Sequence, residues 1–138
     1  MDLECIIGQG NPIVLFFYAR HEGSICTKEV CAFRDNYSVF SKYGAIVIGV
    51  SGNQVESHSS FLKRHRIQFD ILADTDGRLR RMYQVPRTRL GFVPGRATFV
   101  IDSRGHIRDY FSSLMNYRGH VENAIQILDD LYDEGYLK

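Results

Sequence analysis

Ile13-Val14-Leu15-Phe16-Phe17-Tyr18 precedes Gly23-Ser24-Ile25-Cys26-Thr27-Lys28-Glu29-Val30-Cys31, and these two segments are the most informative about the fold. The first segment predicts a fully buried strand over residues 13–18. The second opens a helix predicted over about residues 25–42, which ends near Gly44. A thiol at the junction of a buried strand and a helix occupies a position where rigid elements commonly hold reactive groups.

Cys26 is expected to face inward near the N-terminus of this helix. Apolar side chains recur at helical spacing at Val30, Phe33, Tyr37 and Phe40, and Cys26 falls one turn earlier on the same stripe. The unpaired backbone N–H groups and the helix dipole favour an anion at this end. They therefore stabilise the thiolate, which is the reactive form of cysteine.

Cys31 follows Cys26 on the same predicted helix but is offset from the apolar stripe. In an unbroken α-helix this spacing gives about 140° of rotation and about 7.5 Å of rise, which places the two Cα atoms roughly 8 to 9 Å apart. A disulfide needs Cα atoms within about 7 Å. If the two cysteines form a redox pair, the first turn of the helix must unwind each time the disulfide closes.

The composition is that of one globular domain over residues 1–138. The chain has 138 residues with 44% hydrophobic and 12% aromatic content, enough for a real core. The 17 Lys and Arg nearly balance the 16 Asp and Glu, so charge implies attraction to neither nucleic acid nor membrane.

The compartment is expected to be reducing, and the protein to be soluble, cytoplasmic and monomeric. No stretch approaches the ~20 apolar residues of a membrane span, and the N-terminus lacks the pattern of a secretory signal. Three cysteines are too few for a disulfide scaffold and are odd in number. Cys5, in a short and poorly patterned leader, is interpreted as a bystander.

The rest of the chain alternates strand and helix patterns, which are predicted as a strand at 45–51, a helix at 55–66, a strand at 69–73, a brief helix at 79–83, an irregular connector at 84–95, a strand at 97–102, a turn at 103–105 and a returning strand at 106–111. An amphipathic helix closes the chain, marked by Val121, Ala124, Ile125, Leu128, Leu131 and Tyr132. This order predicts the α/β class: a thioredoxin-like fold with a central mixed sheet and helices on both faces.

Several motifs together resemble the peroxiredoxin Q family, also called bacterioferritin comigratory proteins, within the AhpC/TSA peroxiredoxins. They are Phe16-Phe17-Tyr18, Cys26-Thr27-Lys28-Glu29-Val30-Cys31-Ala32-Phe33-Arg34-Asp35, Val47-Ile48-Gly49-Val50-Ser51 and Arg96-Ala97-Thr98-Phe99-Val100-Ile101-Asp102. The likeness covers roughly residues 12–134. It implies a thioredoxin-fold peroxidase that reduces hydrogen peroxide and organic hydroperoxides without a cofactor or a metal.

The same resemblance implies the roles of four residues. Cys26 matches the peroxidatic cysteine, which attacks the O–O bond and becomes a sulfenic acid. Cys31 matches the resolving cysteine, which forms an intramolecular disulfide that thioredoxin or a similar dithiol reduces. Arg96 matches the arginine that holds the thiolate and polarises the peroxide, and Glu29 stands where the family often places a residue that orients this arginine.

The sequence departs from the family at two positions of the active-site motif. Ala19 stands where the family has a proline that shields the thiolate, and Gly23 where it has a threonine that hydrogen-bonds the peroxide. Loss of a positioned hydrogen bond is expected to slow the reaction, and His21 and Ser24 are the nearby polar groups that could substitute. The segment before the first strand is also shorter than in the family, which favours a truncated or divergent member.

Other interpretations of these residues compete with the peroxidase. Without the flanking motif, Cys26 and Cys31 would be read as two buried core thiols. A zinc site with His21, His58 and His65 is disfavoured, because the cysteine spacing exceeds the usual metal knuckle and no second pair follows. A weakly catalytic redox sensor or interaction module remains the alternative function, and the rate of peroxide turnover distinguishes it from a peroxidase.

Overall fold

The computed structural model describes residues 3–18, 24–52, 55–85, 96–113 and 116–134, with the side chains of 24–26 and 55–58 excepted. Along the chain the elements are α1 (Leu3–Ile6), β1 (Ile13–Tyr18), α2 (Ser24–Asp35), α3 (Tyr37–Lys42), β2 (Ile46–Ser51), α4 (Val55–Arg64), β3 (Asp70–Ala73), α5 (Arg78–Met82), β4 (Ala97–Ile101), β5 (Ile107–Ser112) and α6 (Tyr117–Asp133). None of these described helices is long and apolar enough to cross a membrane.

A single five-stranded sheet has the order β3-β2-β1-β4-β5. β1 pairs in parallel with β2, and β2 with β3, whereas β4 is antiparallel to both β1 and β5. The mixed sheet is therefore confirmed. β1 lies at its centre and all six of its residues are buried, as the unbroken apolar run predicts.

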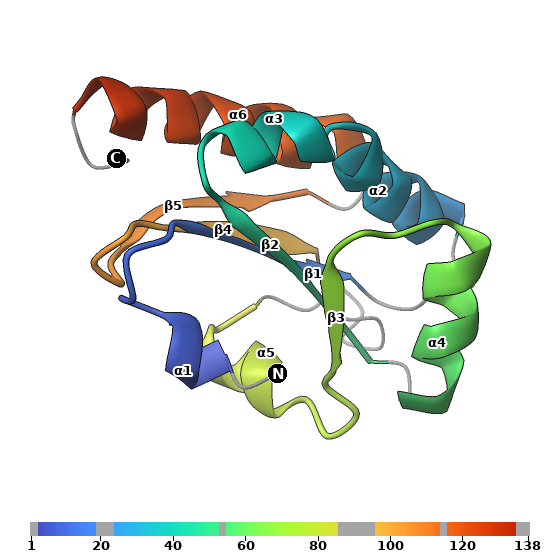
Figure 1. The fold of residues 1–138 in the computed structure, drawn as a ribbon. Coiled ribbons are helices and arrows are strands. Elements are labelled where there is room, and N and C mark those ends of the chain that lie inside the picture. Colours follow the sequence, from blue (N-terminus) through green and yellow to red (C-terminus); the bar gives the residue numbers. More distant parts are fainter. Residues whose placement is uncertain (1–2, 19–23, 53–54, 86–95, 114–115, 135–138) are drawn as a thin grey trace.

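Helices cover both faces of this sheet, which confirms the predicted arrangement. Val14, Phe16 and Tyr18 of β1 belong to a core cluster with residues of α2, α3, α4 and α6. The alternate residues, such as Leu15 and Phe17, pack with side chains from α1 and α5 on the opposite face. Figure 1 shows α2, α3 and α6 above the sheet, and α1 and α5 below it. Because successive side chains of a strand point to opposite faces, a run without polar residues fits only this two-sided burial.

The prediction of one helix over 25–42 is wrong, because Asn36 divides it into α2 and α3. Asn36 has φ −103° and ψ 10°, outside helical values. Its side-chain amide and its backbone N–H both donate to the carbonyl oxygen of Ala32, at 2.8 Å and 3.2 Å, so the side chain shares this acceptor with the helical hydrogen bond. The apolar stripe nevertheless faces the core, since Val30, Phe33 and Phe40 are fully buried and Tyr37 is partly buried.

Smaller differences occur at the ends of elements. The helix predicted over 55–66 ends at Arg64, because Arg66 adopts a left-handed φ of 53°. The short helix α1 was not predicted, and it buries Leu3 against the sheet. Tyr132 was predicted on the inner stripe of α6 but is 59% exposed, whereas His120 is fully buried there. Most of the predicted connector at 84–95 lies outside the described residues.

Candidate active site

Helix α2 carries both cysteines of the signature and is continuous from Ser24 to Asp35. Cys26 lies in its first turn, and its side chain is outside the described part of the structure. The later part of α2 is fixed to the sheet, because the Phe33 ring stacks on Phe16 of β1 with 4.2 Å between ring centroids. Because α2 is continuous, the Cα atoms of Cys26 and Cys31 are too far apart for a disulfide. The first turn of α2 must therefore unwind before the two cysteines can join.

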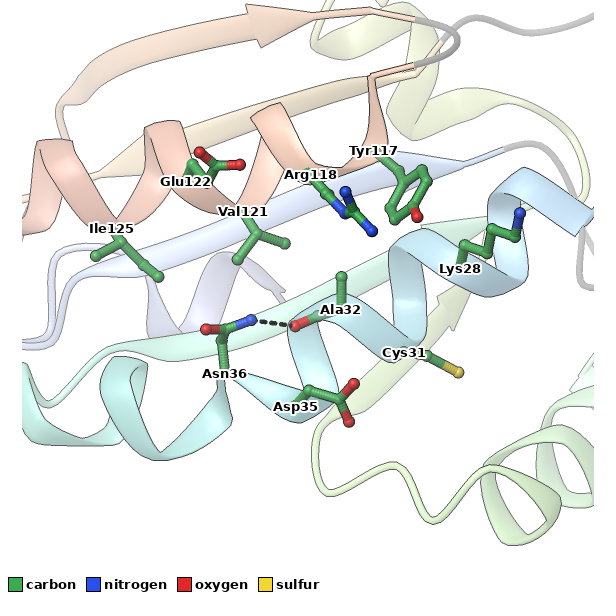
Figure 2. Close-up of a pocket in the computed structure, with 10 residues that line it drawn as sticks. All are labelled: Lys28, Cys31, Ala32, Asp35, Asn36, Tyr117, Arg118, Val121, Glu122 and Ile125. Atoms are coloured by element: carbon green, nitrogen blue, oxygen red, sulfur yellow. Dashed lines mark hydrogen bonds between the residues drawn. The ribbon is translucent and has the colours of Figure 1, made fainter.

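Cys31 is half-buried and lines a groove of about 490 Å³ between α2 and α6. Figure 2 shows Arg118 and Val121 of α6 on one side of this groove, and the Cys31 side chain pointing away from them. The Cys31 sulfur lies 3.9 Å from Nδ1 of His65, just after α4. Burial raises the pKa of the Cys31 thiol, the positive charge of Arg34 opposes this, and Asp35 adds to it.

Glu29, one turn after Cys26, is fully buried on the inner side of α2. Neither of its carboxyl oxygens has a hydrogen-bond partner among the described residues. Burial raises the pKa of Glu29 to about 8, against the opposing positive charge of Arg96. The carboxyl group is therefore protonated and neutral at physiological pH.

Arg96 and Glu29 are separated in the sequence, but the fold brings them together. Arg96 directly precedes β4, and its carbonyl oxygen accepts a hydrogen bond from the Ser112 hydroxyl of β5 at 3.2 Å. Its positive charge opposes the rise that burial causes in the pKa of Glu29, and adds to the fall that burial causes in the pKa of His120. The arginine thus lies within electrostatic reach of the helix that carries Cys26.

His120 and Thr98 complete this buried polar cluster, and neither is among the residues predicted for the site. His120 Nε2 lies 2.8 Å from the carbonyl oxygen of Ser113, so Nε2 carries the proton and donates it. Nδ1, 2.7 Å from Thr98 Oγ1, then accepts the hydroxyl proton. Burial lowers the pKa of His120, the bond to Ser113 opposes this, and Arg96 lowers it further. A histidine four residues before Ala124 on the apolar stripe of α6 was the available signal.

Several predicted positions lie outside the described residues: Ala19, His21 and Gly23 entirely, and Ser24 and His58 in their side chains. Cys5 is described, and it is exposed on α1, on the opposite face of the sheet from α2. Across the described part of the chain, no group of three or more His, Cys, Asp or Glu side chains is placed to hold a metal ion.

The sequence profile of the AhpC/TSA family matches residues 2–110. A chloroplastic peroxiredoxin Q from Sedum lineare is 37% identical over 123 residues, which cover 89% of this chain and 66% of the relative. A chloroplastic peroxiredoxin Q from Populus jackii is also 37% identical, with 58% of its length covered. The chain thus spans less than two thirds of the length of these relatives.

Solved structures agree with these sequence relatives. The Mycobacterium tuberculosis peroxidoxin BcpB superimposes with a TM-score of 0.82 at 32% identity, covering 94% of this chain and 84% of that one. A Xanthomonas campestris peroxiredoxin Q gives a TM-score of 0.81 at 25% identity, covering 89% of this chain and 80% of that one. The thioredoxin-like arrangement of sheet and helices is shared with them.

Proposed function

The chain belongs to the AhpC/TSA family, among the peroxiredoxin Q and bacterioferritin comigratory proteins, and from this we propose that it is a thiol-dependent peroxidase. One observation carries the proposal: a continuous helix bears Cys26 in its first turn and Cys31 further along, with Glu29 between them within reach of the Arg96 charge. Peroxide reduction by thiols needs a nucleophilic cysteine, a cation near it and a second thiol, and this helix with Arg96 supplies all three.

The first step is nucleophilic attack by the Cys26 thiolate on one oxygen of a hydroperoxide. The S–O bond forms, the O–O bond breaks, and the other oxygen leaves and takes up a proton as water or an alcohol. The helix N-terminus favours the thiolate, and the cationic Arg96 stabilises the negative charge that develops on the leaving oxygen. Glu29 is proposed, from the family resemblance, to orient Arg96; the carboxyl group lies within reach of the Arg96 charge, and its raised pKa keeps it from cancelling that charge.

The second step joins Cys31 to the Cys26 sulfenic acid with loss of water. Because α2 holds the two cysteines too far apart, its first turn unwinds while Phe33 remains stacked on Phe16. Cys31 is only half-buried, so the thiol of a reductant such as thioredoxin has access to the disulfide. The protein is further proposed to act as a monomer in the cytoplasm, which size-exclusion chromatography and cell fractionation test.

The decisive experiment treats the reduced protein with one equivalent of hydrogen peroxide and maps its thiols by mass spectrometry. We expect a Cys26–Cys31 disulfide with Cys5 still a thiol, and repeated peroxide consumption when thioredoxin and its reductase are added. Cys26→Ser is expected to abolish consumption, and Cys31→Ser to leave a sulfenic acid at Cys26 that oxidises further. Oxidation of Cys5 with Cys26 and Cys31 unchanged, or equal activity of Cys26→Ser, overturns the proposal.

A further inference from the structure

His65, which the motif does not include, is held against the sulfur of Cys31. Nδ1 of His65 lies 3.9 Å from the Cys31 sulfur, within the reach of a sulfur hydrogen bond. The backbone of His65 is fixed to α2, because Arg34 Nη1 donates to its carbonyl oxygen at 2.8 Å. Its ring packs on Phe61 of α4, with 4.6 Å between centroids. Two elements therefore position the imidazole beside the thiol.

Burial shifts the pKa values of both groups in the directions that leave each of them neutral at pH 7. Burial lowers the pKa of His65, and the cations Arg64 and Arg34 lower it further, so the imidazole is an available base. Burial raises the pKa of Cys31, Arg34 opposes this, and Asp35 reinforces it. A thiol with a raised pKa is a small fraction thiolate at neutral pH, so its attack benefits from a base in contact with it.

Resting on the proposed peroxidase function, we propose that His65 is the general base and general acid for the resolving cysteine, Cys31. As the Cys31 sulfur attacks the sulfenic sulfur of Cys26, Nδ1 of His65 takes the Cys31 proton, the S–S bond forms, and the S–O bond breaks. The departing hydroxide takes up this proton from His65 and leaves as water, so that His65 returns to its neutral form. When a dithiol later reduces the disulfide, its attacking thiol gives a proton to His65, and the imidazolium passes that proton to the Cys31 thiolate that is released.

The anchoring of α2 keeps this contact available during the reaction. Phe33 stacks on Phe16, and Arg34 is bonded to the His65 carbonyl, so the part of α2 around Cys31 is fixed to the sheet and to the α4–β3 connection. The part to be unwound is the first turn, with Cys26. The Cys31 side chain points away from α6 (Figure 2). Cys26 is therefore expected to move toward Cys31, while Cys31 stays beside His65.

The test uses His65→Phe, which keeps a ring against Phe61 but removes the base. The control is His106→Phe, because the side chain of His106 is 74% exposed on the β4–β5 hairpin. Stopped-flow mixing with hydrogen peroxide separates Cys26 oxidation from disulfide closure. We expect His65→Phe to oxidise Cys26 at the wild-type rate and to close the disulfide at least about tenfold more slowly at pH 7. Wild-type closure in His65→Phe overturns the role of His65.

A second measurement needs no peroxide, so it separates this inference from the proposed function. Cys31 is alkylated with iodoacetamide across pH in a Cys5→Ser, Cys26→Ser background, with and without His65→Phe. With His65 present, Cys31 is expected to be alkylated at lower pH than in the His65→Phe variant. In that variant the pH dependence of the alkylation rate should reflect only the raised pKa of the Cys31 thiol. Superimposable profiles overturn the contact. A wild-type protein that fails to react with peroxide contradicts the peroxidase function instead.

Discussion

Glu29 and His120 meet inside the core: Glu29 Oε1 lies 3.4 Å from His120 Nε2, and both side chains are fully buried. The histidine ring has its hydrogen bonds to Thr98 and Ser113, and its lowered pKa leaves it neutral. The carboxyl group is neutral as well, because its pKa is raised to about 8. The contact is therefore one between uncharged groups at neutral pH. Deprotonation of Glu29 would place a buried negative charge behind the active-site helix, which the positive charge of Arg96 offsets only in part.

The raised pKa of Glu29 makes the stability of the fold depend on pH. Between about 4.5 and 8 the folded protein keeps a proton that the unfolded chain has lost, so the free energy of unfolding falls as pH rises through this window. The slope from this one group is at most about 1.4 kcal/mol per pH unit. Glu29→Gln is expected to remove it, as measured by urea unfolding at a series of pH values. The exposed Glu122→Gln is the control, and an unchanged slope in Glu29→Gln contradicts the assignment.

The Thr98 hydroxyl is expected to stabilise the fold through His120. Thr98→Val keeps the shape of the side chain but leaves the buried Nδ1 of His120 without its donor, which costs about 1–3 kcal/mol. Thr98→Ser keeps the hydroxyl and should lose less. Chemical denaturation of both variants measures the difference, and equal losses would show that the methyl group, not the hydrogen bond, matters at this site.

Gly49 of β2 is expected to tolerate no side chain. A Cβ there would lie 2.9 Å from Cζ of Phe16 and 3.3 Å from Cγ1 of Ile71. Gly49→Ala therefore displaces the Phe16 ring, on which Phe33 of the cysteine helix stacks, and is predicted to destabilise the fold by about 1–3 kcal/mol. Thermal unfolding measures the loss. Phe16→Leu in the same chain should recover part of it, and strictly additive losses would contradict the clash.

Restoring the family's residues at Ala19 and Gly23 is expected to speed the reaction with peroxide. Both positions lie outside the described residues, so this prediction rests on the sequence. Ala19→Pro shields the thiolate and Gly23→Thr supplies a hydrogen-bond donor, and a tenfold gain corresponds to about 1.4 kcal/mol of transition-state stabilisation. Stopped-flow oxidation of Cys26 in the single and double variants measures it. No gain in any variant would contradict the prediction and favour a sensor.

Much of the architecture could be predicted because it follows from the spacing of apolar residues along short segments of the chain. The unbroken run from Ile13 to Tyr18 identifies a strand buried on both faces, and the spacing of Val30, Phe33 and Phe40 identifies the inner face of the following helices. The break at Asn36 could not be predicted in this way, because non-helical backbone angles at one residue, beside a side-chain amide that bonds one backbone carbonyl, leave the apolar pattern unchanged.

The order and spacing of neighbouring residues are enough to identify the fold class, the shared helix of Cys26 and Cys31, and the family to which both belong. The contacts of Glu29 with His120 and of His65 with Cys31 exist only in the folded chain. These partners come from α6 and from the residue after α4, far from α2 in the chain. Contacts between elements are set by how they pack on the sheet, and burial, not residue type, fixes which of their polar groups stay neutral.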